Sequence, residues 1–217
     1  MNKSIFIIGA GPGIGRSTAA RFAREGWRVI AADRDRARLD GVIESLGAEG
    51  LTIEGIVLDA TDPGMLRGAL AAANARAGGL DAIHYNAAIV RAQTLFAMTD
   101  AEVTTDLAIN VAGALHTIRA AVDLFEGRGG TILLTGGGLA TDPHPSYASL
   151  GAGKAAVRNV VRGLASDLAK RNIHIAIATV ATLVAPGSPD AEGVADTLFR
   201  LATGPGTGWE LRYPAAS

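Results

Sequence analysis

Cysteine is absent from this chain of 217 residues, which excludes disulfide frameworks and thiolate metal sites. The four histidines are scattered without metal-ligand spacing, so we expect no metal. An excess of either charge is also missing, and the net charge of −1 argues against an electrostatic nucleic-acid footprint. The longest apolar run, Ile173 to Pro186, is too short to span a bilayer, and no leader pattern precedes the first strand. We therefore expect a cytoplasmic protein without nucleic-acid or membrane partners.

Aromatic residues are few, at 5%, whereas apolar residues make up 48% and glycines number 28. Short apolar runs without polar alternation are separated by longer helical patterns, which predicts an α/β fold with a doubly wound parallel sheet and helices on both faces. No linker or repeat divides the chain, so residues 1–217 are expected to form a single domain. The predicted strands are Ser4–Ile8, Arg28–Ala32, Gly55–Leu58, Ala82–Tyr85, Thr131–Leu134, Ile173–Val180 and Trp209–Tyr213. The predicted helices are Gly13–Glu25, Arg36–Leu46, Pro63–Ala77, Asp100–Phe125, Ser149–Arg171 and Ala191–Ala202.

Two predicted helices carry a polar residue on an apolar face. In Asp100–Phe125, Asn110 lies on a stripe that includes Leu107, and in Ser149–Arg171, Lys154 shares a face with Leu150. Such side chains need partners, because burial without them costs a few kcal/mol. The apolar stripe of the first helix consists of Val103, Leu107, Val111, Leu115, Ile118, Val122 and Phe125.

A glycine-rich turn joins the first predicted strand to the first helix. Gly9, Gly13 and Gly15 give the spacing GxxxGxG, with Gly11 and Ile14 between them. Gly9 allows a sharp exit from the strand, Gly13 lets the backbone approach a pyrophosphate, and Gly15 permits close packing of helix on sheet. The helix N-terminus attracts phosphates through its free amides and its dipole. The turn therefore predicts a dinucleotide site, the alternative being an ordinary tight strand–helix turn.

Two aspartates follow predicted strands next to this turn. Asp33 can accept hydrogen bonds from the adenosine ribose hydroxyls and would repel a 2′-phosphate, which favours NAD. Arg34 could instead receive that phosphate, so NADP stays possible, and Asp33 could alternatively cap the next helix. Asp59 could bond the adenine amino group or cap the helix that begins near Pro63.

These features and four further segments resemble the short-chain dehydrogenase/reductase family over nearly the whole chain. The segments are Asp59-Ala60, Tyr85-Asn86-Ala87-Ala88 with two departures from Asn-Asn-Ala-Gly, Ile109-Asn110-Val111, and the stretch from Pro145 to Val157 around the Tyr-x-x-x-Lys motif. The resemblance implies a Rossmann-like NAD(P)-binding fold with cofactor contacts at Ala60, Asn86, Ala87 and Lys154. It also implies that Asn110 kinks its helix and holds a catalytic-site water.

The departures from the family fall on its chemistry. Leu150 stands at the position of the catalytic tyrosine and Gly137 at that of the substrate-orienting serine. Lys154 stands at the position of the family's lysine, and the resemblance implies that it binds the nicotinamide ribose. Tyr147 or His144 could replace the lost proton donor, although Tyr147 lies seven residues before Lys154, a helical rise of about 10.5 Å. General acid–base help is worth about 10²–10⁴-fold, so its loss would cripple ordinary carbonyl reduction.

The C-terminal third has little room for a substrate lid, because the last predicted strand–helix connection is short. Two main functions remain open, besides the weaker alternative that another enzyme of NAD(P) or nucleotide chemistry uses the same scaffold. One is an NAD(P)-dependent oxidoreductase that moves hydride between nicotinamide and a small carbonyl or alcohol with a degenerate set of catalytic residues. The other is an inactive NAD(P)-binding protein, a redox sensor or a non-catalytic subunit. The resemblance also implies a homodimer or homotetramer.

Overall fold

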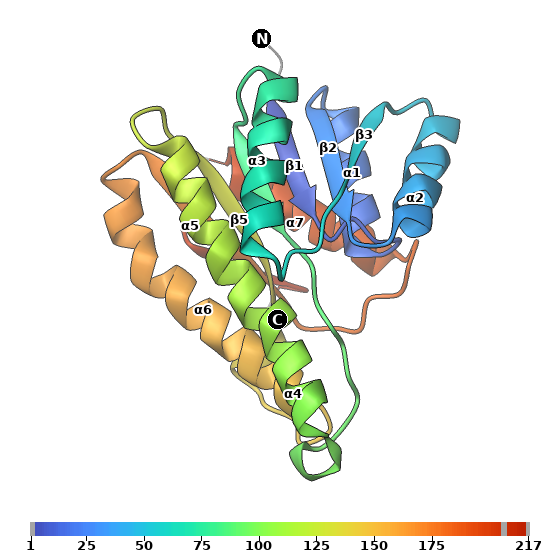
Figure 1. Cartoon of the computed structure of the whole chain (residues 1–217), viewed down its shortest axis with the longest axis vertical. Coiled ribbons are helices and arrows are strands. Elements are labelled where there is room, and N and C mark those ends of the chain that lie inside the picture. Colours follow the sequence, from blue (N-terminus) through green and yellow to red (C-terminus); the bar gives the residue numbers. More distant parts are fainter. Residues whose placement is uncertain (1–2, 205–207, 216–217) are drawn as a thin grey trace.

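The computed structural model describes residues 3–204 and 208–215. Its centre is a parallel sheet of seven strands in the order β3-β2-β1-β4-β5-β6-β7, covered by helices on both sides (Figure 1). The strands are β1 (Ser4–Ile8), β2 (Arg28–Asp33), β3 (Ile53–Val57), β4 (Ala82–Tyr85), β5 (Gly130–Gly137), β6 (Ile173–Val180) and β7 (Glu210–Tyr213). The predicted fold class is confirmed, with strand ends displaced by a few residues.

Each face of the sheet has its own apolar core. On one face, residues of β1, β4 and β5 pack against α3 (Pro63–Ala77), α5 (Gly113–Phe125) and α6 (Ala148–Ala169). On the other face, the alternate residues of the same strands pack against α1 (Ile14–Arg24), α2 (Arg36–Ala48) and α7 (Pro189–Thr203). Burial on both faces explains why the strands read as continuous apolar runs.

The predicted helices all form, and local chemistry fixes their ends. Asp35, Asp62 and Ser188 each accept a backbone N–H of the first turn, at the starts of α2, α3 and α7. Helix α7 therefore begins at Pro189, two residues before the predicted start. A proline at the first helical position has no amide left unsatisfied.

The long predicted helix Asp100–Phe125 is interrupted by a π-helical turn. It divides into α4 (Asp100–Leu107), a π-helical turn η2 (Ala108–Ala112) and α5. A π turn inserts one extra residue and rotates the face of the helix that precedes it. Leu107, predicted to be buried, is accordingly 38% exposed, whereas its neighbour Asp106 is fully buried.

By length and composition alone, Asp100–Phe125 is also the one described helix that could cross a membrane. In this fold Ile118 and Phe125 of the same helix are buried in the core on the face of α3 and α6. The α5 part of the apolar stripe is therefore accounted for by packing in this core.

Candidate functional site

A cavity of about 900 Å³ opens beyond the carboxyl ends of the strands. β1 lies between β2 and β4, so chain order reverses there, and ligands of open α/β sheets bind at such a switch point. Ile8, Asp33, Asn86 and Val180 mark its extent along the edge of the sheet. Most of the predicted cofactor residues line it: Gly9, Gly11, Gly13, Ile14, Gly15, Asp33, Arg34, Ala60, Asn86, Ala87 and Lys154.

The glycine-rich turn is closely packed beneath the cavity. Gly9 has φ of +88°, and a Cβ there would lie 2.4 Å from the Ala87 nitrogen. A Cβ on Gly15 would lie 2.4 Å from the Gly9 carbonyl oxygen, so α1 packs directly on the turn. Gly13 faces open space, since a Cβ there would have no atom of the described residues within 4 Å. The turn thus fits a pyrophosphate at the start of α1, as its sequence predicts.

Asp33 lies at the end of β2 and its side chain reaches the cavity. It is 6% exposed, and its Oδ1 accepts hydrogen bonds from the Asp35 backbone N–H and from the Arg38 guanidinium. Asp35, not Asp33, caps α2, so the alternative role predicted for Asp33 is wrong. Arg34 and Arg38 both line the cavity beside this carboxylate.

Asp59 does not line the cavity, as far as the described residues define it. Its Oδ1 accepts hydrogen bonds from the backbone N–H and the hydroxyl of Thr61, at 2.9 and 2.7 Å. These bonds lower the pKa of Asp59. The cap of α3 is Asp62, so the predicted capping role of Asp59 is wrong, and its contact with adenine stays a prediction.

A buried chain of hydrogen bonds connects the glycine turn to the centre of the sheet. Asn86 Nδ2 donates to the Gly9 carbonyl at 2.8 Å, and Thr135 Oγ1 donates to Asn86 Oδ1 at 2.8 Å. His84 Nε2 lies 2.9 Å from Thr135 Oγ1. Since that hydroxyl already donates to Asn86, His84 Nε2 carries the proton, and Nδ1 has no partner among the described residues. Burial, reinforced by the charge of Lys154, lowers the pKa of His84 to about 3.

Lys154 reaches from α6 to the end of β5. Its Nζ donates to the Thr135 carbonyl at 2.7 Å, and burial lowers its pKa to about 8. Leu150, one turn earlier, is 7% exposed and lines the cavity. Gly137 also lines the cavity, and a Cβ there would lie 3.2 Å from Lys154 Cγ. Lys154, Leu150 and Gly137 therefore meet at the cavity, and their assignment to the catalytic positions of the family stays a prediction.

Asn110 sits in the π turn but is not among the described residues that line the cavity. Its Oδ1 accepts the Ile89 N–H at 2.8 Å and its Nδ2 donates to the Ile89 carbonyl at 3.0 Å. Asn110 lies in the π turn that interrupts the helix, while the expected kink and its role toward a water stay predictions. The Ile109 carbonyl in the same turn accepts a hydrogen bond from Tyr85 Oη at 2.6 Å. Burial, with the charge of Asp59, raises the pKa of Tyr85.

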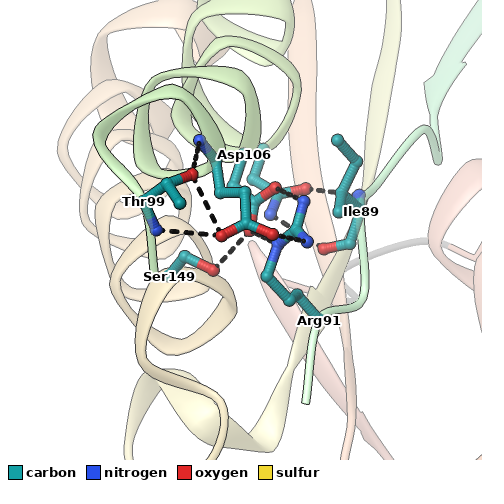
Figure 2. A network of polar contacts seen from close by, with 7 residues as sticks. Ile89, Arg91, Thr99, Asp106 and Ser149 are labelled. Atoms are coloured by element: carbon teal, nitrogen blue, oxygen red, sulfur yellow. Dashed lines mark hydrogen bonds and ion pairs between the residues drawn. The ribbon is translucent and has the colours of Figure 1, made fainter. Parts of the chain in front are cut away.

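A partly buried ion pair anchors the loop after β4 to α4 and α6 (Figure 2). Arg91 donates to both carboxylate oxygens of Asp106, at 3.0 and 3.1 Å, and to Glu102 at 2.8 Å. Ser149, in the first turn of α6, donates to Asp106 Oδ2 at 2.7 Å. Burial opposes ionisation, but the bonds from Arg91 and Ser149 outweigh it and lower the pKa of Asp106. The bonds of Asp106 to Arg91 and Ser149 therefore hold the loop after β4, which lines the cavity at Ile89 and Val90, against α6, the helix that carries Lys154.

Tyr147 and His144 line the cavity from the loop before α6. Tyr147 is the N-cap residue of that helix, so it lies outside the helical turns that carry Lys154. His144 Nδ1 accepts the Ser146 backbone N–H at 3.1 Å, and its ring lies 5.9 Å from that of Tyr147. The predicted short lid corresponds to residues 181–188, between β6 and α7. Within it Leu183 is 83% exposed at the cavity.

The comparison with known proteins agrees with this architecture. A model of the short chain dehydrogenase family matches residues 3–191, and the chain belongs to this family. The oxidoreductase asL5 of Sarocladium schorii is 31% identical over 192 residues, which cover 88% of this chain and 76% of that protein. The 2,3-dihydro-2,3-dihydroxybenzoate dehydrogenase of Bacillus subtilis is 28% identical over 191 residues, covering 88% and 71%. The crystal structure of a short chain dehydrogenase from Mycobacterium smegmatis has a TM-score of 0.91 and 26% identity, covering 100% of this chain and 93% of that one.

Three contributors to the site are not evident from the sequence: Arg38, Thr135 and Asp106. The position of Arg38 could have indicated its contact with Asp33, since it follows Asp33 by five residues at the start of a helix. Thr135 gave no such indication, because its partners His84 and Asn86 come from another part of the chain, β4 and the loop after it. Asp106 was hidden by the π turn, which no spacing rule for a regular helix anticipates.

Proposed function

We propose that this protein is an NAD(P)-dependent oxidoreductase that transfers hydride between nicotinamide and a small carbonyl compound or alcohol. One observation carries the proposal: the same cavity contains both the glycine turn with Asp33 and the retained Lys154. β2 and β5 are separated by three strand spacings, or about 14 Å, which leaves room for an extended dinucleotide. Members of the family generally use NAD(P), and this chain belongs to it.

The residues present fit the cofactor. The backbone of Gly11, Gly13 and Ile14 would hold the pyrophosphate at the N-terminus of α1. Asp33 would accept the adenosine ribose hydroxyls, which favours NAD, while Arg34 and Arg38 leave NADP possible. Lys154 would donate to the nicotinamide ribose hydroxyls. A nicotinamide held there would supply the hydride for the carbonyl carbon, and water in the cavity would supply the proton for the oxygen.

A second candidate is a protein that binds the dinucleotide without turnover, as a redox sensor or a non-catalytic subunit. Leu150 and Gly137 favour it, because they line the cavity and their side chains have no polar atom that could hold or protonate a substrate oxygen. The short connection 181–188 also covers little of the cavity. We expect a cytoplasmic homodimer or homotetramer in either case, by resemblance to the family.

Binding and turnover separate the two candidates. NADH and NADPH binding is measured by fluorescence, and carbonyl substrates are then screened with the wild type and with Leu150→Tyr plus Gly137→Ser. Turnover by the wild type supports the oxidoreductase and eliminates the sensor. Tight binding with turnover only in the double variant eliminates the oxidoreductase. The serine must displace the Lys154 stem slightly, since its Cβ would lie 3.2 Å from Cγ.

A further inference from the structure

His144 occupies a rigid part of the loop that walls the cavity. It stands between Pro143 and Pro145, whose rings fix φ on both sides. Its carbonyl accepts the Tyr147 N–H at 3.0 Å, and its ring lies beside the Tyr147 ring. The imidazole is therefore held at the cavity although the residue is exposed.

The hydrogen bond from Ser146 determines which ring nitrogen of His144 carries the proton. The Ser146 N–H donates to Nδ1 at 3.1 Å, so Nδ1 uses its lone pair as an acceptor. A neutral imidazole with an acceptor at Nδ1 has its hydrogen on Nε2. The loop thus supplies a neutral N–H donor, and a donor of this kind can polarise a carbonyl.

The two nearest polar side chains on β5 and α6, Thr135 and Lys154, already donate hydrogen bonds within the protein. The side chains of Leu150 and Gly137 provide no donor. The Thr135 hydroxyl donates its hydrogen bond to Asn86 Oδ1, and Lys154 Nζ donates to the Thr135 carbonyl. The cavity otherwise contains Asp142, Tyr147 and Arg212 as charged or titratable groups, together with Asp33, Arg34 and Arg38 at the adenosine end.

We propose that His144 Nε2–H donates a hydrogen bond to the substrate carbonyl oxygen and so replaces the orienting role of the missing hydroxyls. The inference rests on the proposed oxidoreductase function. The substrate is an aldehyde or ketone whose oxygen points toward residues 143–147 instead of toward α6. When hydride adds to the carbonyl carbon, the π electron pair moves to oxygen. The oxygen then takes a proton from water, the hydroxide passes to the solvent, and His144 ends the step neutral.

Two substitutions separate this role from a role in holding the loop. His144→Asn keeps an acceptor for the Ser146 N–H, because the asparagine Oδ1 stands where Nδ1 does, but removes the Nε2 donor. His144→Gln loses that acceptor and places an amide N–H near the position of Nε2. We expect His144→Asn to lower kcat about 10²–10³-fold, the range for loss of one oxyanion donor, and His144→Gln to recover about tenfold or more of it. A purely structural role predicts the opposite order of the two variants.

A second readout does not need turnover. An unreactive carboxamide serves as carbonyl analogue, and its affinity is measured by titration into the protein saturated with NADH. We expect His144→Asn to weaken the analogue about tenfold or more, the equivalent of one hydrogen bond, without changing NADH affinity. His116→Asn, a matched substitution on α5, should change neither. In the wild type, the ¹⁵N NMR signals should show the Nε2–H tautomer of His144.

The outcomes distinguish the inference from the function on which it rests. Absence of NADH and NADPH binding overturns the proposed function. Normal turnover and normal analogue affinity in His144→Asn overturn the role of His144 and leave the function intact. If the wild type binds NADH but does not turn over, unchanged analogue affinity in His144→Asn still overturns the donor role.

Discussion

Lys154 Nζ donates to the backbone carbonyl of Thr135, at 2.7 Å, and this bond places an ammonium group at the end of β5 without a carboxylate partner among the described residues. The same threonine uses its hydroxyl to connect His84 with Asn86. One residue of β5 therefore links the retained lysine to the bonds that support the glycine turn.

Lys154 should make stability increase with pH above neutrality. Burial lowers its pKa from 10.5 to about 8, so between these values the unfolded chain binds more protons than the folded one. Stability should therefore be lowest below pH 8 and rise between pH 8 and 10, by up to about 3 kcal/mol. Urea unfolding at pH 7 and 9.5 measures the rise. Lys154→Met should be more stable than the wild type at pH 7 and weaken NADH binding, and an undiminished rise in this variant would contradict the assignment.

His84 should destabilise the fold in acid. Its pKa is lowered from 6.5 to about 3, so the unfolded chain gains protons first as the pH falls through this window. Between pH 6.5 and 5 this group alone should remove about 2 kcal/mol of stability. Thermal and urea unfolding of the wild type and of His84→Leu at pH 7 and pH 5 test it. Equal losses of stability between pH 7 and pH 5 in both proteins would show that other groups cause the destabilisation in acid.

Gly9→Ala should disrupt the turn and the site together. The positive φ disfavours any side chain, and the new Cβ would overlap the Ala87 backbone. We expect a loss of about 2 kcal/mol or more of stability and loss of NADH binding. Gly41→Ala is the matched control, since Gly41 lies in α2 with no described atom near its Cβ position, and it should stabilise by about 0.5–1 kcal/mol. Comparable effects at the two positions would refute the packing argument.

Replacing only one partner of the Arg91–Asp106 pair should lower the free energy of unfolding more than replacing both. Asp106 is fully buried and receives two bonds from Arg91 and one from Ser149. Asp106→Leu should cost about 1–3 kcal/mol, because it removes the acceptor of Arg91 and of the buried Ser149 hydroxyl, while Arg91 keeps Glu102 and partial exposure. Arg91→Met combined with Asp106→Leu should recover much of this loss, as judged by a double-mutant cycle in urea. Additive losses would mean that the two side chains do not depend on each other.

Cofactor choice should depend on Asp33. Its carboxylate faces the cavity beside Arg34 and Arg38, and the latter donates to it. Asp33→Ser should weaken NADH and strengthen NADPH, changing their ratio of dissociation constants by about tenfold or more, or about 1.4 kcal/mol. Arg36→Ser, an exposed change on the same helix as Arg38, serves as the control. An unchanged ratio would remove Asp33 from the specificity argument.

Most of the fold could be predicted from the sequence. The apolar run Ile173–Val180 and the turn from Gly9 to Gly15 specify their structure locally, because burial on both faces and tight turns impose strong residue preferences. The helix ends were less accessible. Pro189 could have indicated the start of α7, but the aspartate caps depend on which of several neighbouring carboxylates reaches the free amides.

The sequence by itself determined the family and the parallel sheet, and it predicts the dinucleotide turn and the absence of two catalytic hydroxyls at Leu150 and Gly137. The tertiary structure decided which polar residues pair, since His84 with Thr135 and Arg91 with Asp106 come from different elements. It also decided that Asp106 rather than Leu107 is buried, because the π turn rotates one part of the helix against the other. Local preferences act over a few residues, whereas burial and hydrogen-bond partners are set only when distant segments meet.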